Sequence, residues 1–448
     1  MNLPTSPTPS LLIRGAHLVL PDQEPMQGDL RVEQGQIVEI GSELSGGADR
    51  VIEATGLWLL PGVIDPQVHF REPGLEHKED LRTASHACAK GGVTSFLEMP
   101  NTRPLTTTQA LLQDKLDRAA QKCVVNYGFF IGATVDNLME VNTAAPACGI
   151  KIFMGSMSGP LLIDDESALE PIFATGTRLI AVHAENQARI RARREAFAGR
   201  TEPAVHSQIQ DNQAALEATQ LALKLSKKYQ RRLHILHLST AEEVELLRQD
   251  KPAWVTAEVT PQHLLLNTSA YERIGTLAQM NPPLRSEHDN AVLWQGLQEG
   301  ILNFIATDHA PHTLEEKAKT YPDSPSGMPG VETSLPLMLT AAQQGRCSVS
   351  QVATWMSTNV AAAYGIANKG KLAVGYDADL VLVDLDQVKP VKREDLLTKS
   401  GWSPFEGWPL TGWPVITIVG GQVVYEHGKV NSEVRGQALR FSPQLLAD

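Results

Sequence analysis

RLIAVHAE (178–185) is a short apolar run that ends in a histidine and a glutamate. Such runs are typical of strands that are buried on both faces, as in a parallel sheet. Seven more lie between about residues 60 and 366, each followed by a longer helical pattern: GVIDPQVHF (62–70), VTSFLEMP (93–100), VVNYGFFIGA (124–133), GIKIFM (149–154), RLHILHLS (232–239), WVTAEVT (254–260) and ILNFIATDH (301–309). Eight strand–helix units predict an α/β fold with a closed (β/α)8 TIM barrel.

The two ends of the chain have a different rhythm. LLIRGAHLVL (11–20) and DLRVEQGQIVEI (29–40) alternate apolar and polar residues in short bursts, and so do ADLVLVDL (378–385) and ITIVGGQVVY (416–425). This pattern indicates short antiparallel strands and hairpins. We therefore expect a small β-sandwich domain formed from residues 1–60 and 367–448, with the barrel, residues 61–366, inserted between its two parts.

Composition narrows the class of protein. Of the 448 residues, 42% are hydrophobic and 20% are charged, as in a globular protein with a sizeable core. The net charge is −12 and no long basic run occurs, so nucleic acid and anionic membranes are poor partners. The apolar runs are too short to span a membrane, and the polar, proline-rich start MNLPTSPTPS is unlike a signal peptide. The four cysteines form no CxxC pair, which favours a cytoplasmic, reducing location.

Polar residues that bind metals well stand at the ends of several apolar runs. The carboxyl ends of barrel strands meet at one rim, where active sites lie. A single histidine there is more often structural, and Asp308 alone could cap the next helix. Together, a histidine or an aspartate at the same end of four different strands predicts a Zn²⁺ site with an open position for water, formed by His69, His183, His237 and Asp308.

Two of the runs contain residues that allow more than one interpretation. Lys151 lies in an apolar strand, where a lone ammonium is costly. It could form an ion pair with Glu185, or react with CO₂ to give a carbamate that bridges two metal ions. In the sixth run, strict alternation predicts that only one of His234 and His237 points into the barrel. His237 is the better ligand because it is nearer the carboxyl end.

The motifs resemble those of the dihydroorotases, in the cyclic amidohydrolase branch of the amidohydrolase superfamily. The resemblance covers nearly the whole chain. The combination of MPNT, NPPLR and ATDHAPH distinguishes it from allantoinases and hydantoinases. The matching segments are QVHFREPGLEHKED (67–80), EMPNTRP (98–104), GIKIFMGS (149–156), VHAE (182–185), LHLST (236–240), MNPPLR (280–285), ATDHAPH (306–312) and SGMPGVETSLPL (326–337).

The resemblance implies a site for one or two zinc ions. His69 and Asp308 would hold one ion, His183 and His237 the other, and carboxylated Lys151 would bridge them. It also implies the substrate contacts: Arg71, Asn101 and His312 would bind a carboxylate, Asn281 would line the pocket, and the loop around Gly327 would touch the small-molecule substrate.

The reaction implied is the reversible cyclisation of N-carbamoyl-L-aspartate to L-dihydroorotate, a step of pyrimidine biosynthesis. In the hydrolytic direction, the metal ions would lower the pKa of a bound water and provide hydroxide. Asp308 would act first as general base and then as general acid. The resemblance further implies a homo-oligomer, a dimer or a tetramer.

Gln67 departs from the family pattern, which has histidine at this position. A glutamine oxygen is a weaker zinc ligand than imidazole, so one metal ion would be held loosely or be missing. Two alternatives therefore stay open. One is an allantoinase or a dihydropyrimidinase-type cyclic amide hydrolase. The other is a weak or inactive structural partner of aspartate transcarbamoylase.

Overall fold

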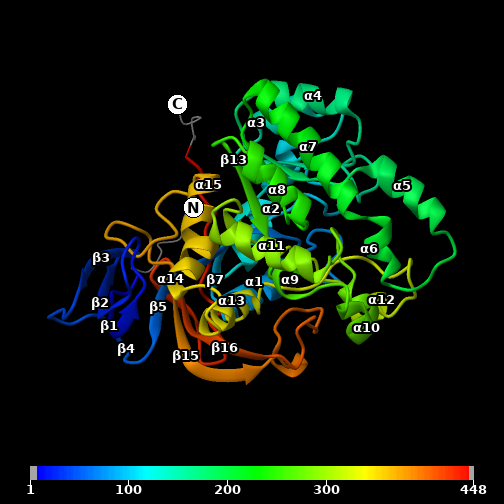
Figure 1. Cartoon of the computed structure of the whole chain (residues 1–448). Coiled ribbons are helices and arrows are strands. Elements are labelled where there is room, and N and C mark those ends of the chain that lie inside the picture. The colour runs from blue at the N-terminus through cyan, green and yellow to red at the C-terminus, as the bar shows by residue number, and fades with distance from the viewer. Residues whose placement is uncertain (1–7, 443–448) are drawn as a thin grey trace.

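The centre of the molecule is a barrel of parallel strands. The structure is a computed structural model that describes residues 8–442, and Figure 1 shows helices packed around the strands. The barrel strands follow the predicted runs in order: β6 (Val63–Val68), β7 (Val93–Glu98), β8 (Asn126–Phe129), β9 (Ile131–Gly132), β10 (Ile150–Phe153), β11 (Ile180–His183), β12 (Leu233–Ile235), β13 (Val255–Val259) and β14 (Phe304–Ile305). β8 and β9 both lie within the run 124–133 and together form one barrel strand. Its first part, β8, pairs with β7, and its second part, β9, pairs with β10. The (β/α)8 barrel is confirmed.

The seam between the first and last barrel strands is closed by contacts from both sides. Val68 and His309 form a parallel bridge, and the His69 amide donates to the His309 carbonyl over 2.7 Å. The buried Asp65 carboxylate accepts from the amide of Thr307 at 3.1 Å and from its hydroxyl at 2.5 Å. The ends of these two strands are thereby fixed side by side.

Helices cover the outside of the barrel, each with an apolar stripe toward the strands. In α7, Ala214, Ala218 and Ala222 are buried at a spacing of four residues, which places them on one helix face. The α-helices are α1 (Leu81–Lys90), α2 (Gln109–Lys122), α3 (Leu138–Thr143), α4 (Glu166–Ala174), α5 (Gln187–Ala196), α6 (Val205–Ile209), α7 (Asn212–Tyr229), α8 (Ala241–Asp250), α9 (Pro261–Leu265), α10 (Ala270–Ile274), α11 (Glu287–Gln298), α12 (Leu314–Lys317), α13 (Ser334–Gln343), α14 (Val349–Ala353) and α15 (Asn359–Tyr364). Shorter turns are η1 (Gly275–Ala278), η2 (Thr354–Thr358) and η3 (Arg393–Asp395).

The two ends of the chain combine in one small β domain, as predicted. Its nine-stranded sheet contains β1 (Leu11–Leu18), β2 (Met26–Glu33), β3 (Gln36–Gly41), β4 (Arg50–Glu53), β5 (Trp58–Pro61), β15 (Leu380–Pro390), β16 (Pro409–Val419), β17 (Gln422–Glu426) and β18 (Lys429–Val430). β5 joins the two ends, because it pairs parallel with β1 and antiparallel with β15. Side chains from both ends, among them Leu11, Leu30, Leu380 and Ile418, share one buried cluster.

The C-terminal third of the chain also returns to the barrel. Between β15 and β16, the buried Trp402 donates its indole N–H to the carbonyl of His312 over 2.8 Å. Further on, Gly436 passes so close to β8 that a Cβ atom at this position would lie 1.9 Å from the Val125 carbonyl oxygen. The region after residue 367 therefore supports the barrel as well as the β domain.

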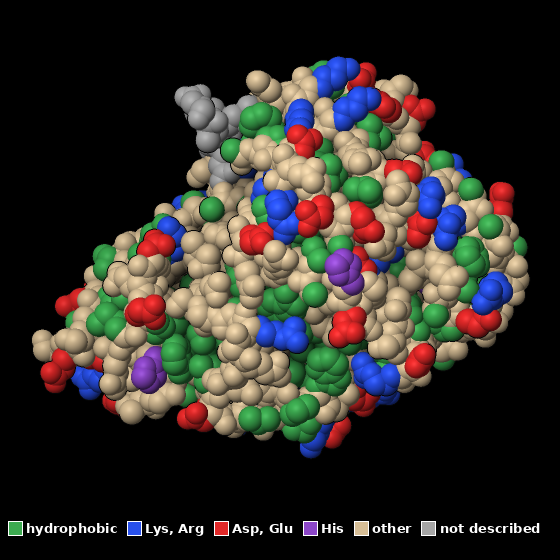
Figure 2. All heavy atoms as spheres, viewed as in Figure 1, with side chains coloured by type: hydrophobic (Ala, Val, Ile, Leu, Met, Phe, Trp, Pro, Cys, Tyr) green, Lys and Arg blue, Asp and Glu red, His purple; other side chains and the backbone are tan. Residues whose placement is uncertain are grey.

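The surface in Figure 2 is mixed in character. On the face shown in Figure 2, acidic and basic side chains are interspersed, with apolar side chains scattered between them. No helix within residues 8–442 is long and apolar enough to cross a membrane.

Candidate active site

The predicted site residues meet in one cavity of about 220 Å³ at the carboxyl ends of the barrel strands. They are Gln67, His69, Arg71, Asn101, Lys151, His183, His237, Asn281, Asp308, His312 and Gly327. The cavity has other lining residues that sequence reasoning did not single out, namely Phe153, Ser156, Met157, Ala310 and Ser326.

His69 and Asp308 form the first pair of potential metal ligands. Their atoms Nε2 and Oδ1 lie 3.1 Å apart, and His69 Nδ1 lies 2.7 Å from the side-chain oxygen of Asn101. With that oxygen as acceptor, Nδ1 carries the hydrogen and Nε2 presents its lone pair. Burial lowers the pKa of His69, which keeps the ring neutral. Two lone pairs then face each other, which is the arrangement that a cation between them would satisfy.

His183 and His237 form the second pair. His183 Nδ1 lies 2.8 Å from His237 Nε2, and His183 Nε2 lies 2.7 Å from the buried carboxylate of Glu185. Glu185 accepts from Nε2–H, so the Nδ1 lone pair of His183 faces the cavity. Carboxylates commonly orient metal-binding histidines in this way. Because Glu185 is committed to His183, the predicted alternative of an ion pair between Glu185 and Lys151 is wrong.

Lys151 lines the same cavity as the two pairs. Its ammonium has no ion pair with a carboxylate among the described residues, and the nearest aromatic contact is the Phe153 ring at 4.4 Å. Burial lowers the pKa of Lys151 to about 7, while the negative charge of Asp308 raises it. The charge of Lys151 in turn lowers the pKa of His237, after the larger effect of burial. Lys151 therefore acts electrostatically on one member of each pair.

The donor set fits a metal site only if Lys151 takes part. Within residues 8–442, no group of three or more histidine, cysteine or acidic side chains is placed to hold one ion. The ligands instead form two pairs, each one donor short of the three that catalytic zinc sites have. A carbamate on Lys151 would add one oxygen to each pair.

Left-handed backbone turns several of these side chains into the cavity. Arg71, Ser156, His237 and Asp308 have φ angles of 68°, 56°, 36° and 46°. Residues other than glycine seldom adopt this conformation, which costs free energy and clusters at functional sites.

The structure corrects the alternation argument for β12. His234 also faces the barrel interior: it pairs with Glu258 at 2.9 Å and stacks on Phe304 at a centroid distance of 4.8 Å. β12 ends at Ile235, and the left-handed turn at His237 returns that side chain to the cavity. Both histidines therefore face inward, and His237 alone lines the cavity.

Arg71 and His312 form another part of the cavity wall. Arg71 is buried, its Nε donates to the Pro311 carbonyl over 3.1 Å, and its Nη2 lies 3.3 Å from His312 Nε2. Burial lowers the pKa of Arg71 to about 10, so the guanidinium stays charged near neutral pH. It has no ion pair with a carboxylate within the part of the chain that the structure describes. Since a buried cation requires compensation, this wall is suited to an anionic group.

Asn281 and Gly327 shape the rest of the cavity. The Asn281 oxygen accepts from His206 Nε2 over 2.8 Å. Gly327 has a φ of 133°, and a Cβ there would lie 2.4 Å from the Ala310 carbonyl oxygen, so no other residue fits. Its amide donates to the Gln279 carbonyl over 2.9 Å, which fixes the loop against the next segment.

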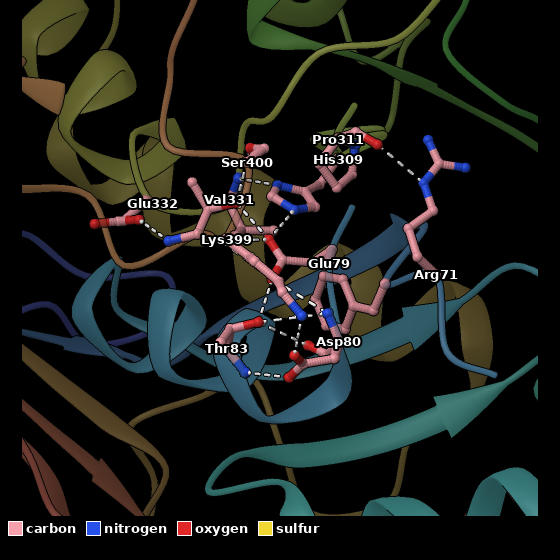
Figure 3. A network of polar contacts seen from close by, with 12 residues as sticks. Arg71, Glu79, Asp80, Thr83, His309, Pro311, Val331, Glu332, Lys399 and Ser400 are labelled. Atoms are coloured by element: carbon pink, nitrogen blue, oxygen red, sulfur yellow. Dashed lines mark hydrogen bonds and ion pairs between the residues drawn. The ribbon is translucent and has the colours of Figure 1, made fainter. Parts of the chain in front are cut away.

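A buried glutamate braces the residue next to Asp308. Figure 3 shows Glu79 below the ring of His309, with Thr83 and Lys399 around it. Glu79 accepts from the Lys399 amide at 3.1 Å, and its carboxylate lies 3.7 Å from His309 Nε2. His309 Nδ1 accepts from the Gly330 amide over 3.0 Å. The C-terminal segment thus supports the site.

Similarity to known proteins shows the family of the chain. Residues 58–424 match the amidohydrolase family. The chain belongs to the amidohydrolase family. A protein named dihydroorotase from Methanosarcina acetivorans is 37% identical to this amidohydrolase over 431 residues, which cover 92% of each chain. One of the same name from Bacillus subtilis is 34% identical, covering 94% of this chain and 99% of its own.

Solved structures of related enzymes share the fold. The L-hydantoinase (dihydropyrimidinase) from Arthrobacter aurescens superposes on this amidohydrolase with a TM-score of 0.92 and 34% identity, covering 96% of this chain and 99% of its own. The dihydropyrimidinase from Brevibacillus agri has a TM-score of 0.88 and 27% identity. The family and these relatives indicate a metal-dependent hydrolase of cyclic amides that acts on a small molecule.

Proposed function

We propose that this amidohydrolase is a dihydroorotase, which converts N-carbamoyl-L-aspartate and L-dihydroorotate into each other. The observation that carries the proposal is the buried, uncompensated guanidinium of Arg71 beside His312. Dihydroorotate has a carboxylate on its ring, and a planar guanidinium binds a carboxylate with two parallel hydrogen bonds. The relatives named dihydroorotase support the same substrate.

Three residues would hold that carboxylate. Arg71 supplies the charge and His312 supplies an N–H from the same wall. Asn101 supplies its amide N–H groups, since its oxygen is engaged with His69. Asn281 and the loop at Gly327 would close the cavity around the ring. Bound in this way, the substrate would have its ring carbonyl directed toward the two ligand pairs.

The proposed metal ligands are His69, Lys151, His183, His237 and Asp308, for one or two zinc ions. Bound there, zinc would supply Lewis acidity toward the ring carbonyl and activate water. The pKa of about 7 leaves a good part of Lys151 neutral at pH 7. The neutral amine adds to CO₂, forming an N–C bond and releasing one proton, which gives the carbamate.

Asp308 would move the proton. Its Oδ1 accepts from Gln67 and faces His69, and its Oδ2 has no hydrogen bond to any residue that the structure describes. As general base, Asp308 takes the proton of the attacking water, and as general acid it passes that proton to the leaving ring nitrogen. The synthetic direction reverses these steps.

We also propose an oligomeric state, a cellular location and a domain organisation for this amidohydrolase. We propose a homo-oligomer, a dimer or a tetramer, because Val135 just before α3 and Met139 within α3 are exposed apolar side chains. A cytoplasmic location is supported by four free cysteines.

The organisation into residues 1–60, 61–366 and 367–448 is supported by the strand pairing of β5 with β15. Association with aspartate transcarbamoylase as an inactive partner is disfavoured, because every proposed ligand lines the cavity.

The second candidate is a dihydropyrimidinase-type hydrolase, favoured by the structural likeness to the Arthrobacter aurescens enzyme. L-Dihydroorotate and dihydrouracil separate the two, because they share a ring and differ by the carboxylate. We expect kcat/KM for dihydroorotate to exceed that for dihydrouracil by about a hundredfold, the effect of a charge-assisted hydrogen-bonded pair. Equal or better turnover of dihydrouracil would favour the second candidate.

A further inference from the structure

Both ring nitrogens of His312 are engaged at the wall of the cavity. Nδ1 lies 3.0 Å from the ammonium nitrogen of Lys78, and Nε2 lies 3.0 Å from the carbonyl oxygen of Ser326. Lys78 belongs to the loop between β6 and α1 and does not line the cavity. The two contacts therefore reach His312 from different sides, and Lys78 acts from behind the ring.

The hydrogen positions follow from what each partner can do. An ammonium has three N–H donors and no lone pair, so Nδ1 must accept. A carbonyl oxygen has no hydrogen, so Nε2 must donate to Ser326. The guanidinium Nη2 of Arg71, which can only donate, would need the opposite form, but it lies farther from Nε2, at 3.3 Å. Burial and the positive charges of Arg71 and Lys78 hold the pKa of His312 well below its usual value, which keeps the ring neutral. A neutral imidazole has one hydrogen, and here it stands on Nε2.

A nearby carboxylate favours the opposite tautomer. Glu316 Oε2 lies 3.5 Å from Nδ1, while Oε1 of the same carboxylate lies 3.1 Å from the Lys78 nitrogen. Lys78 is closer to Nδ1 and occupies that acceptor. Without Lys78, the carboxylate would be the remaining charged neighbour of Nδ1 and would draw the hydrogen to that side.

We propose that Lys78 is a positioning residue that fixes His312 as the Nε2–H tautomer. In that form Nε2 has no lone pair for the guanidinium Nη2 of Arg71, which lies 3.3 Å away. The Arg71 N–H is thereby kept for a substrate carboxylate, which can also share Nε2–H with the Ser326 carbonyl. This use of the tautomer rests on the proposed function. The tautomer itself is independent of any substrate.

The direct test is the ¹⁵N spectrum of the histidine side chains in the metal-loaded protein without substrate. The His312 signals are assigned by their loss in His312→Gln. We expect wild type and Lys78→Arg to show a hydrogen-bearing Nε2 and a bare Nδ1. Lys78→Met is expected to shift the hydrogen to Nδ1 or to protonate both nitrogens. A bare Nε2 in wild type, or an unchanged pattern in Lys78→Met, would overturn the proposal.

Kinetics on dihydroorotate separate this proposal from the proposed function. We expect Lys78→Met to raise KM about tenfold or more with kcat nearly unchanged, the effect of one charge-assisted hydrogen bond, and Lys78→Arg to restore most of the loss. In His312→Gln, whose amide can replace Nε2–H, a further Lys78→Met is expected to add less than twofold. Unfolding midpoint and metal content check that the variants are folded. If the spectra are as expected but dihydroorotate is not turned over, the tautomer proposed for His312 is upheld and dihydroorotate is rejected as the substrate.

Discussion

Gln67 donates its side-chain amide to Oδ1 of Asp308 over 3.0 Å, and its own Oε1 is buried without a hydrogen-bond partner. Gln67 therefore faces the proposed ligand pair of His69 and Asp308 with a donor, where a metal would require a lone pair. This arrangement weakens one of the two proposed metal positions.

Gln67→His is expected to strengthen that position, because imidazole is the better zinc ligand. After dialysis against a weak chelator, wild type should retain about one zinc ion per chain and the variant about two. Elemental analysis of both proteins, prepared in parallel with bicarbonate, measures this. Equal metal content would show that Gln67 does not limit binding.

Arg71→Met tests the carboxylate contact. We expect KM for dihydroorotate to rise about a hundredfold, since a charged hydrogen-bond donor is removed from a buried site. Turnover of dihydrouracil, which lacks the carboxylate, and zinc content should stay close to wild type. Steady-state kinetics with both substrates provide the measurement. An unchanged KM for dihydroorotate would show that Arg71 does not bind the substrate carboxylate.

Lys115→Met tests the support beneath the cavity. Lys115 and Glu98 are a fully buried ion pair at 2.9 Å, and Glu98 also accepts from the Phe70 amide, beside His69. Removing the lysine leaves a buried carboxylate uncompensated, which costs about 3–5 kcal/mol.

The matched control for Lys115→Met is Lys122→Met on the same helix. Its partner Glu72 keeps the Leu81 amide at 3.1 Å and Arg118 at 3.6 Å. The midpoint of thermal unfolding should fall much further for Lys115→Met than for the control. Similar shifts for the two variants would contradict a supporting role of the buried pair.

Lys317→Met tests the loop at Gly327. The buried Lys317 ammonium donates to the carbonyls of Gln279, Pro325 and Gly327 at 3.0, 2.8 and 3.2 Å, which ties two cavity segments together. We expect KM for dihydroorotate to rise about tenfold, the effect of losing charged hydrogen bonds. The exposed Lys319→Met on the same segment should match wild type, and a similar KM in both variants would argue against this role.

The same lysine predicts a dependence of stability on pH. Burial lowers the pKa of Lys317 to about 7 from 10.5. Above pH 7 the folded chain loses this proton while the unfolded chain keeps it, so this residue's contribution to stability rises with pH up to 10.5. The difference in unfolding midpoint between wild type and Lys317→Met should shift in favour of wild type from pH 7 to pH 9. A difference that stays constant would show that folding does not change the protonation of Lys317 between pH 7 and pH 9.

Trp402→Phe tests the contact from the C-terminal segment. The variant loses the hydrogen bond to the His312 carbonyl but keeps an aromatic ring, and KM for dihydroorotate should rise about fivefold, within the effect of one neutral hydrogen bond. Trp413→Phe is the control, because the Trp413 indole bonds locally to the Leu410 carbonyl at 3.1 Å. It should lower the unfolding midpoint without changing KM. Equal KM values in both variants would show that the segment does not influence the site.

The sequence predicted which residues meet, because barrel topology brings the carboxyl ends of all strands to one rim. It singled out His69, Lys151, His183, His237 and Asp308, and all five line the cavity. It did not predict the partners that orient them. Glu185 pairs with His183, and Lys78 pairs with His312. Both contacts depend on side-chain positions that cannot be predicted from the periodicity of the sequence. The inward face of His234 was missed for a related reason, since the left-handed turn at His237 breaks the alternation of the strand.

Hydrolysis of L-dihydroorotate by the purified chain, with metal content determined on the same sample, decides whether the proposed function is right. We expect turnover in a protein that holds about one or two zinc ions per chain, as expected for two pairs of ligands bridged by a carboxylated lysine. Absence of both turnover and bound metal, after zinc and bicarbonate have been supplied, would contradict the proposed function.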